Sequence, residues 1–172
     1  MMRKPRALDL RALRFVGVFS VLVFSLTFLV QLGWMEDRLI APYTRMLSAL
    51  GGITLETLGT EVQVLGTVIR HDGFAVDIRR GCDGVVATIL LVSACLAYPF
   101  SWKDRLLGTS LGYVLIFVLN MFRIVGLFLV GVRGSTQTFD FFHTYVSQFG
   151  VITVTMVFWI YWAGRRRTDS TT

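Results

Sequence analysis

The chain has few residues able to hold a metal or close a disulfide, with two cysteines and two histidines among 172 residues. Cys82 and Cys95 stand thirteen positions apart on what should be one helix, too far apart for a disulfide. Spread as they are, these cysteines and histidines make an implausible zinc set. The sequence also lacks a Gly-rich phosphate loop, a Gly-x-Ser-x-Gly elbow and a His-Glu-x-x-His helix. We therefore expect neither a metal nor a cofactor.

Charged residues are also scarce, at 16%, whereas hydrophobic residues make up 54%. This composition is too apolar for a soluble domain of this size. Crossing the apolar core of a bilayer takes roughly 20 apolar residues per helix. We therefore predict one all-α integral membrane bundle of about four transmembrane helices, with a small extracytoplasmic amphipathic helix and β-hairpin and no second domain.

The apolar stretches that we predict to cross the membrane are residues 15–34, 85–100, 106–132 and 143–163. The first is long and lacks a small-residue cleavage pattern after it, which favours a retained anchor over a signal peptide. Ten of the 17 Lys and Arg lie in residues 1–14, 101–105 and 164–172, against three acidic residues there. Cytoplasmic segments are rich in Lys and Arg, so we expect both ends inside and residues 35–81 outside. The +6 charge then reflects topology rather than nucleic-acid binding.

Residues 35–81 change their periodicity along the segment. The first part repeats apolar residues at helical spacing, which predicts a helix on the outer membrane face, its end loosened by Gly51-Gly52. The later part alternates apolar and polar residues on either side of Asp72-Gly73, which predicts a β-hairpin with these two as its turn. The second hairpin strand leads directly into Cys82. The apolar residues concerned are Leu39, Ile40, Tyr43, Met46, Leu47 and Leu50, then Val62, Val64, Val68, Phe74, Val76 and Ile78.

Three polar residues fall at a comparable depth under the outer surface in this topology. Cys82 lies at the outer end of the second span and His143 at the outer end of the fourth. Arg123 lies about nine residues inward on the third, or ~13 Å of helix, and its long side chain can extend outward. An arginine inside an apolar span costs ~2.5–3.5 kcal/mol on insertion scales and usually faces a functional cavity or a partner.

A thiol, an imidazole and a guanidinium together support acyl transfer. The helix N-terminus and the arginine should make the Cys82 thiol unusually acidic. His143 can take the thiol proton and return it to a leaving amine. Arg123 keeps its charge and suits stabilisation of an oxyanion or binding of a substrate carboxylate.

Each of these residues also has a purely structural interpretation. Cys82 can be a small buried residue at a helix start, His143 an interfacial cap, and Arg123 a partner of Asn120 or of an outer acid such as Asp140. Arg79 and Arg80 can hold lipid headgroups or substrate, or form an interfacial charge pair. Two other kinds of protein fit as well. One is a non-enzymatic membrane scaffold or assembly protein whose Arg123 pairs with a partner helix. The other is a thiol-redox protein, which the lack of a second cysteine near Cys82 argues against.

Three sequence blocks occur in an order that is itself informative. Gly73–Ile78 followed by Gly81-Cys82-Asp83-Gly84-Val85 is a strand leading to Cys-x-Gly. Asn120-Met121-Phe122-Arg123-Ile124 is an Asn-x-x-Arg-Ile helix, and His143 opens an aromatic-rich segment with Gly150 that ends in basic residues. In these blocks the chain resembles the exosortase/archaeosortase family of membrane transpeptidases. It looks like a compact form similar to exosortase H, since typical members are longer.

The resemblance implies that Cys82 is the nucleophile and that Arg123 and His143 complete the site. It implies substrates that are secreted proteins with a C-terminal sorting signal made of a short motif, a transmembrane helix and a basic tail. Such a cysteine protease or transpeptidase would act on the outer side of the cytoplasmic (inner) membrane, among membrane lipids. Asp83 stands where Ser or Thr is common. An acid there should raise the pKa of the Cys82 thiol unless it pairs with a neighbouring arginine.

Overall fold

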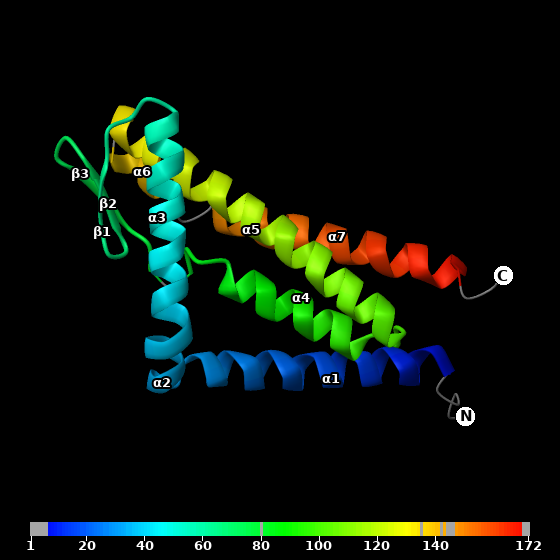
Figure 1. The fold of residues 1–172 in the computed structure, drawn as a ribbon. Coiled ribbons are helices and arrows are strands. Elements are labelled where there is room, and N and C mark those ends of the chain that lie inside the picture. The colour runs from blue at the N-terminus through cyan, green and yellow to red at the C-terminus, as the bar shows by residue number, and fades with distance from the viewer. Residues whose placement is uncertain (1–6, 80, 135, 142, 144–146, 170–172) are drawn as a thin grey trace.

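The computed structural model describes residues 7–79, 81–134, 136–141, 143 and 147–169. It is mostly helical, as predicted, and Figure 1 shows its long helices running side by side. These are α1 (Ala7–Val30), α4 (Val85–Ala97), α5 (Trp102–Arg133) and α7 (Ser147–Asp169). Both chain ends lie at one end of this bundle, and a small sheet with helix α3 lies at the other. The termini and the segment around Cys82 are therefore well separated along the bundle.

Helix α5 is the longest element, and residues at both of its ends stabilise it. The Ser101 hydroxyl accepts a hydrogen bond from the Asp104 backbone N–H at 3.2 Å, which caps the first turn. Arg133 lies in the last turn, where a cation opposes the negative end of the helix dipole. The helix runs unbroken through Asn120 and Arg123, so these polar residues project from a continuous helix rather than interrupting it.

Small residues on α5 let its neighbours approach closely. A Cβ on Gly112 would lie 2.5 Å from the Leu91 Cδ2 of α4 and 2.8 Å from Phe158 of α7. A Cβ on Gly108 would lie 2.6 Å from the Trp162 Nε1. Real Cβ atoms do not approach side chains so closely, so glycine at these positions sets the spacing of α4, α5 and α7.

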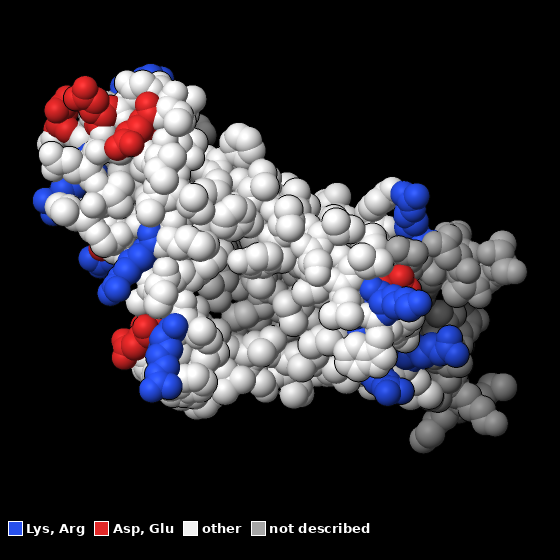
Figure 2. All heavy atoms as spheres, in the orientation of Figure 1, with Lys and Arg blue, Asp and Glu red and all other residues white. Residues whose placement is uncertain are grey.

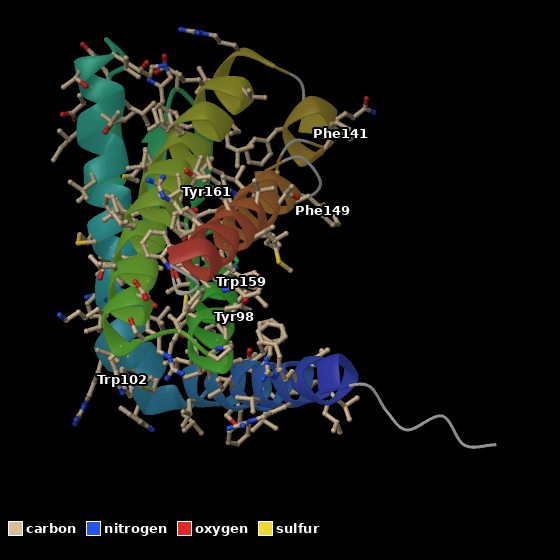
Figure 3. The ribbon with its side chains drawn as sticks, turned by 90° about the vertical axis from the view of Figure 1, so that its right-hand side faces the viewer. Tyr98, Trp102, Phe141, Phe149, Trp159 and Tyr161 are labelled. Atoms are coloured by element: carbon tan, nitrogen blue, oxygen red, sulfur yellow. The ribbon has the colours of Figure 1, made fainter. Side chains whose placement is uncertain are left out.

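Helix α1 is held to the bundle by aromatic rings. Phe15 stacks on Trp159 of α7 with ring centroids 5.5 Å apart, and Tyr98 meets Trp159 edge to face at 5.6 Å. Figure 3 shows Tyr98 and Trp159 close together between α1 and the rest of the bundle. Such offset and edge-to-face pairs contribute about 0.5–1.5 kcal/mol each beyond the area they bury.

A run of helical segments crosses the end of the bundle opposite the termini (Figure 1). It consists of a short turn α2 (Gly33–Met35), a wider π-helical turn η1 (Glu36–Ile40) and the helix α3 (Ala41–Thr57). The expectation that Gly51-Gly52 loosens the helix end is wrong, because α3 continues to Thr57 and both glycines are buried in it. A Cβ on Gly52 would lie 2.4 Å from Val64. These glycines therefore let the sheet pack directly on α3.

The predicted hairpin is present but has a third strand. β2 (Val68–His71) and β3 (Phe74–Asp77) pair antiparallel around the predicted Asp72-Gly73 turn. Both turn residues have positive φ angles of 40° and 82°, the region that a tight hairpin turn requires. The stretch expected as the first strand divides at Gly66, and β1 (Gln63–Leu65) pairs with β2 on its other edge. The order is thus β1-β2-β3, with β3 at the edge nearest in sequence to Cys82.

An apolar core joins the sheet to α3 and α5. Ile69 of the sheet, Leu47 of α3 and Phe128 of α5 are each fully buried there. Ile78, immediately after β3, belongs to the same cluster and is 2% exposed. Ile78 therefore anchors the end of β3 against α5.

A short helix follows α5 in the stretch between the predicted spans 106–132 and 143–163. α6 (Thr136–Phe141) is a short helix, and α7 begins at Ser147, four residues later than the predicted span 143–163. His143 therefore lies between α6 and α7 rather than on the last long helix.

Charge is distributed as a membrane bundle requires. On the face drawn in Figure 2, Lys and Arg gather near the termini, charges of both signs gather at the sheet end, and the middle carries neither. Leu10–Val30 and Trp102–Arg133 are long and apolar enough to cross a membrane. Val85–Ala97 and Phe149–Arg165 are shorter apolar helices. At ~1.5 Å per residue, α4 spans about 20 Å, short of the ~30 Å hydrocarbon core. The count of four crossings stays a prediction.

Candidate active site

The loop that carries Cys82 is shaped by two glycines. Gly81 and Gly84 have φ angles of 88° and 76°, which glycine adopts readily and other residues rarely. Between them the Cys82 N–H donates to the Arg79 carbonyl at 2.9 Å, closing a turn. A Cβ on Gly84 would lie 3.2 Å from the Ile116 Cγ2 of α5. The loop thus turns tightly against α5 before α4 begins at Val85, and it leaves Cys82 half-buried.

Arg123 reaches this loop from α5. Its side chain is 9% exposed, and Nη1 donates a hydrogen bond to the Gly81 carbonyl at 2.9 Å. Its Nη2 lies 3.6 Å from the Cys82 Sγ. A buried guanidinium is strongly destabilising unless its donors are used, and these contacts use them on the cysteine loop. The alternative pairing with Asn120 is not made, because the Asn120 amide atoms have no hydrogen-bond partner among the described residues.

His143 completes the group from the far end of the chain. Its Nε2 lies 3.0 Å from the Cys82 Sγ, a direct thiol–imidazole contact between residues 61 positions apart. The side chain is half-buried. Cys82, Arg123 and His143, predicted from depth alone to lie close together, are therefore brought into mutual reach around one sulfur atom.

The electrostatics of the thiol differ from the sequence prediction. Burial raises the pKa of the Cys82 thiol above its ordinary value, and this outweighs the lowering effect of the Arg123 guanidinium. The Asp83 carboxylate adds to the rise. The expectation of an unusually acidic thiol is thus wrong for this state of the protein. A low-dielectric environment penalises the charged thiolate and so raises the pKa of the thiol. The helix dipole acts mainly within the first turn of a helix, and Cys82 lies before the first turn of α4.

The other predicted site residues have different surroundings. Asp83 is 2% exposed, and its Oδ1 accepts a hydrogen bond from the Val85 N–H at 3.1 Å. Burial raises the pKa of this carboxyl. Arg79 is exposed and pairs with Asp77 at 2.6 Å. The Asp77 carboxyl also accepts from the Thr67 hydroxyl, and both contacts lower its pKa. Arg80 lies outside the described residues.

Asn120 is fully buried and stands one helical turn before Arg123. A Cβ on Gly84 would lie 3.6 Å from its Cγ, so the amide packs against the turn that follows Cys82. Because its exposure is 0%, a substrate cannot touch it in this conformation. Asn120 is therefore placed to support the cysteine loop rather than to bind substrate.

Sequence reasoning missed the aromatic neighbours of His143. The ring of Phe139 stacks on the imidazole at a centroid distance of 5.6 Å and an interplanar angle of 14°. Phe139 lies four positions before His143 in the sequence, but it falls between two predicted spans, where we expected no helix. Phe74, read only as part of a strand, meets Phe139 edge to face at 5.5 Å.

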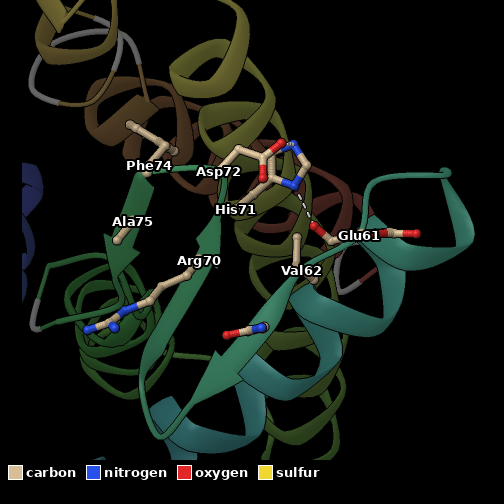
Figure 4. Close-up of a pocket in the computed structure, with 9 residues that line it drawn as sticks. Glu61, Val62, Arg70, His71, Asp72, Phe74 and Ala75 are labelled. Atoms are coloured by element: carbon tan, nitrogen blue, oxygen red, sulfur yellow. Dashed lines mark hydrogen bonds and ion pairs between the residues drawn. The ribbon is translucent and has the colours of Figure 1, made fainter.

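Two further features lie away from this group. Residues Glu61–Gln63 and Arg70–Ala75 line an open hollow of about 720 Å³ on the sheet, shown in Figure 4, which includes neither Cys82 nor His143. Cys95 is fully buried in the contact between α4 and α5, and neither Cys82 nor Cys95 is in a disulfide. In the part of the chain that the structure describes, no three His, Cys, Asp or Glu side chains cluster as a metal site would need.

A helical membrane protein with a thiol–imidazole pair beside a buried guanidinium is the class that this fold and site define. The sequence matches the family of transmembrane exosortases over residues 9–161, which is most of the chain. The chain therefore belongs to the transmembrane exosortase family, as its sequence blocks predicted. No curated protein and no solved structure matches it.

Proposed function

We propose that this chain is a membrane-embedded cysteine transpeptidase that cleaves the C-terminal sorting signal of secreted proteins and transfers the new C-terminus to an acceptor. The observation that carries the proposal is the 3.0 Å contact between Cys82 Sγ and His143 Nε2, with the Arg123 guanidinium 3.6 Å from the same sulfur. Membership of the exosortase family supports acyl transfer as the reaction class.

The raised pKa of the thiol means that the first step needs a group to accept the thiol proton. Burial raises the pKa of the Cys82 thiol, and His143 Nε2, 3.0 Å from the Cys82 Sγ, acts as a general base while the sulfur attacks. The S–H proton moves to Nε2, a C–S bond forms at the scissile carbonyl, and the peptide C–N bond breaks. Protonated His143 then gives its proton to the leaving amine, which departs with the transmembrane part of the signal. An acceptor nucleophile attacks the thioester and releases Cys82 as a thiol.

Arg123 has two tasks in this scheme. Its Nη1 is held by the Gly81 carbonyl, which fixes the guanidinium relative to the cysteine loop. Its Nη2 faces the sulfur, where it offsets the negative charge that develops as the proton leaves. This use within the chain also disfavours the scaffold alternative, in which Arg123 is reserved for a partner helix.

The position of the site agrees with a substrate that is itself anchored in the membrane. Cys82 lies in the segment between β3 and α4, and the sheet that this segment follows is at the end of the bundle opposite the termini. Basic residues near the termini would face the cytoplasm, so the site would open on the outer side of the inner membrane. A substrate helix lying beside the four proposed crossings would present the motif that precedes it to Cys82. Exposed Arg79, with Arg80 next in sequence, is suited to lipid headgroups or to the substrate backbone near the membrane surface.

The test is processing of a secreted reporter that ends in a tripartite signal taken from the same genome. We expect the Cys82→Ala, Arg123→Ala and His143→Ala variants, at wild-type membrane levels, to leave the reporter uncleaved. Cys95→Ala is the matched control and should process normally, since Cys95 lies in a separate core cluster away from Cys82. Cleavage by Cys82→Ala would refute the proposal. Loss of function in Cys95→Ala, with a mixed disulfide trapped on Cys82, would favour the redox alternative instead.

A further inference from the structure

The imidazole of His143 contacts the first of a series of aromatic rings that extends into the core. Phe139 stacks on it nearly parallel, at 5.6 Å and 14°. Phe74 of β3 then meets Phe139 edge to face at 5.5 Å and 81°. Phe74 in turn meets Phe128 of α5 at 5.6 Å and 65°, and Phe128 is fully buried. The ring series thus links His143 to the core shared by the sheet and α5.

A glycine on α5 makes room for the middle of this series. A Cβ on Gly131 would lie 2.0 Å from the Phe74 Cζ and 2.5 Å from its Cε1. Any side chain at position 131 would therefore displace the Phe74 ring. Gly126, on the same helix, has nothing within 4 Å of its Cβ position, so α5 does not need glycine at every such place.

Orientation of the imidazole decides whether it can accept the Cys82 proton. The Nε2–Sγ contact is short, and a hydrogen bond weakens steeply when the donor and acceptor move out of line. A ring stacked on one face cannot tilt without losing that contact, whereas rotation within its own plane is restrained by the sulfur itself. The stack and the thiol together restrict the orientation of the ring.

We propose that Phe139 is a positioning residue for His143, and that Phe74, seated over Gly131, holds Phe139 in place. This inference rests on the proposed function, in which His143 is the base for Cys82. It assigns to the sheet a role in the reaction, because β3 delivers Phe74 to the ring series as well as leading into the Cys82 loop. Phe139 acts through His143, on whose ring it stacks.

The experiment measures alkylation of Cys82 by iodoacetamide across pH in detergent-solubilised full chain, in a Cys95→Ala background that leaves one thiol. We expect His143→Ala to slow alkylation at neutral pH by about tenfold or more, since general-base assistance commonly contributes 10²–10⁴. Phe139→Leu should slow it to nearly the same extent. Phe139→Tyr, which keeps the stacking ring, should alkylate at the wild-type rate.

A double-mutant cycle separates positioning from general loosening of the fold. If Phe139 acts through His143, Phe139→Leu causes no further change in the His143→Ala background. An effect of equal size in both backgrounds would overturn the inference. Normal alkylation of Phe139→Leu beside slow His143→Ala would overturn it too, while leaving the proposed function intact. Equal rates for wild type and His143→Ala would instead remove the proposed base, and the positioning role with it.

A second route leaves Phe139 unchanged and guards against misfolding of its variants. Gly131→Ala should slow alkylation by displacing Phe74. Phe74→Leu alone should slow it too, and adding Gly131→Ala to Phe74→Leu should cause little further change. Gly126→Ala is the matched control on the same helix and should have no effect. Failure of Gly131→Ala to slow alkylation, in a chain that binds detergent and unfolds like wild type, would refute the role of Phe74.

Discussion

Replacing Arg123 with an uncharged residue of similar length tests the electrostatics of the site most directly. In Arg123→Met the apolar packing of the side-chain stem is largely kept, and the cation 3.6 Å from the Cys82 Sγ is lost. The Arg123 charge lowers the pKa of the thiol against the effects of burial and of Asp83. Removing it must therefore raise that pKa further.

The size of the effect follows from the distance. Two unit charges 3.6 Å apart interact by about 4–5 kcal/mol at an effective dielectric constant of ~20, which corresponds to about 3 pKa units as an upper limit. Opposite charges at this range commonly shift a pKa by about 1–3 units. Cys82 is half-buried and water screens part of the interaction, so we expect a rise of about 1–2 units.

The assay is the rate of Cys82 alkylation at pH 8, again in the Cys95→Ala background. Below the thiol pKa the thiolate fraction falls tenfold for each unit that the pKa rises, so Arg123→Met should react about 10–100 times more slowly. Arg123→Lys keeps the charge but cannot hold the Gly81 carbonyl and face the sulfur at once, so it should react at an intermediate rate.

Arg133→Met supplies the control, because Arg133 is an exposed arginine in the last turn of the same helix. It should alkylate like wild type. If Arg123→Met also alkylated at the wild-type rate, with an unchanged thermal unfolding midpoint, the guanidinium would not lower the pKa of the thiol. The role given to Arg123 would then be wrong.

Two further predictions concern the loop and the bundle. Asp83→Asn removes a charge that raises the thiol pKa but keeps an oxygen for the Val85 N–H, so alkylation at pH 8 should become a few-fold faster; a slower reaction would contradict the assigned sign. Gly112→Ala should destabilise the protein by about 1–3 kcal/mol in thermal unfolding, because its Cβ would lie 2.5 Å from Leu91 Cδ2. Gly126→Ala, with open space at its Cβ, should be neutral or slightly stabilising, and equal effects at the two positions would show that Gly112 does not set the helix spacing.

Much of the fold was predictable because it depends on short-range patterns. Apolar runs of sufficient length predict helices whatever surrounds them, and α1 and α5 follow from this. The turn at Asp72-Gly73 follows from backbone preference, since these residues accept the positive φ angles that the turn needs. The three polar residues of the candidate site were identifiable because cysteine and histidine are rare in this chain, and because Arg123 is a charged residue inside an apolar stretch.

Other features depend on packing between distant segments, which no local pattern records. The continuation of α3 through Gly51-Gly52 was missed because glycine is intrinsically a poor helix former. Glycine is needed there because Val64 of the sheet occupies the space that a side chain on Gly52 would fill. The division of the first strand at Gly66 depends likewise on pairing with β2.

The sequence by itself predicted that Cys82, Arg123 and His143 lie at similar depth on three different segments, because helix rise and charge asymmetry are the features from which depth is predicted. Only the tertiary structure decided that they meet around one sulfur and that the thiol is less acidic than expected. Depth is a property of each segment alone, whereas contact and desolvation depend on which segments enclose the group. Burial disfavours the thiolate more than one arginine favours it, and no reading of residue order contains that balance.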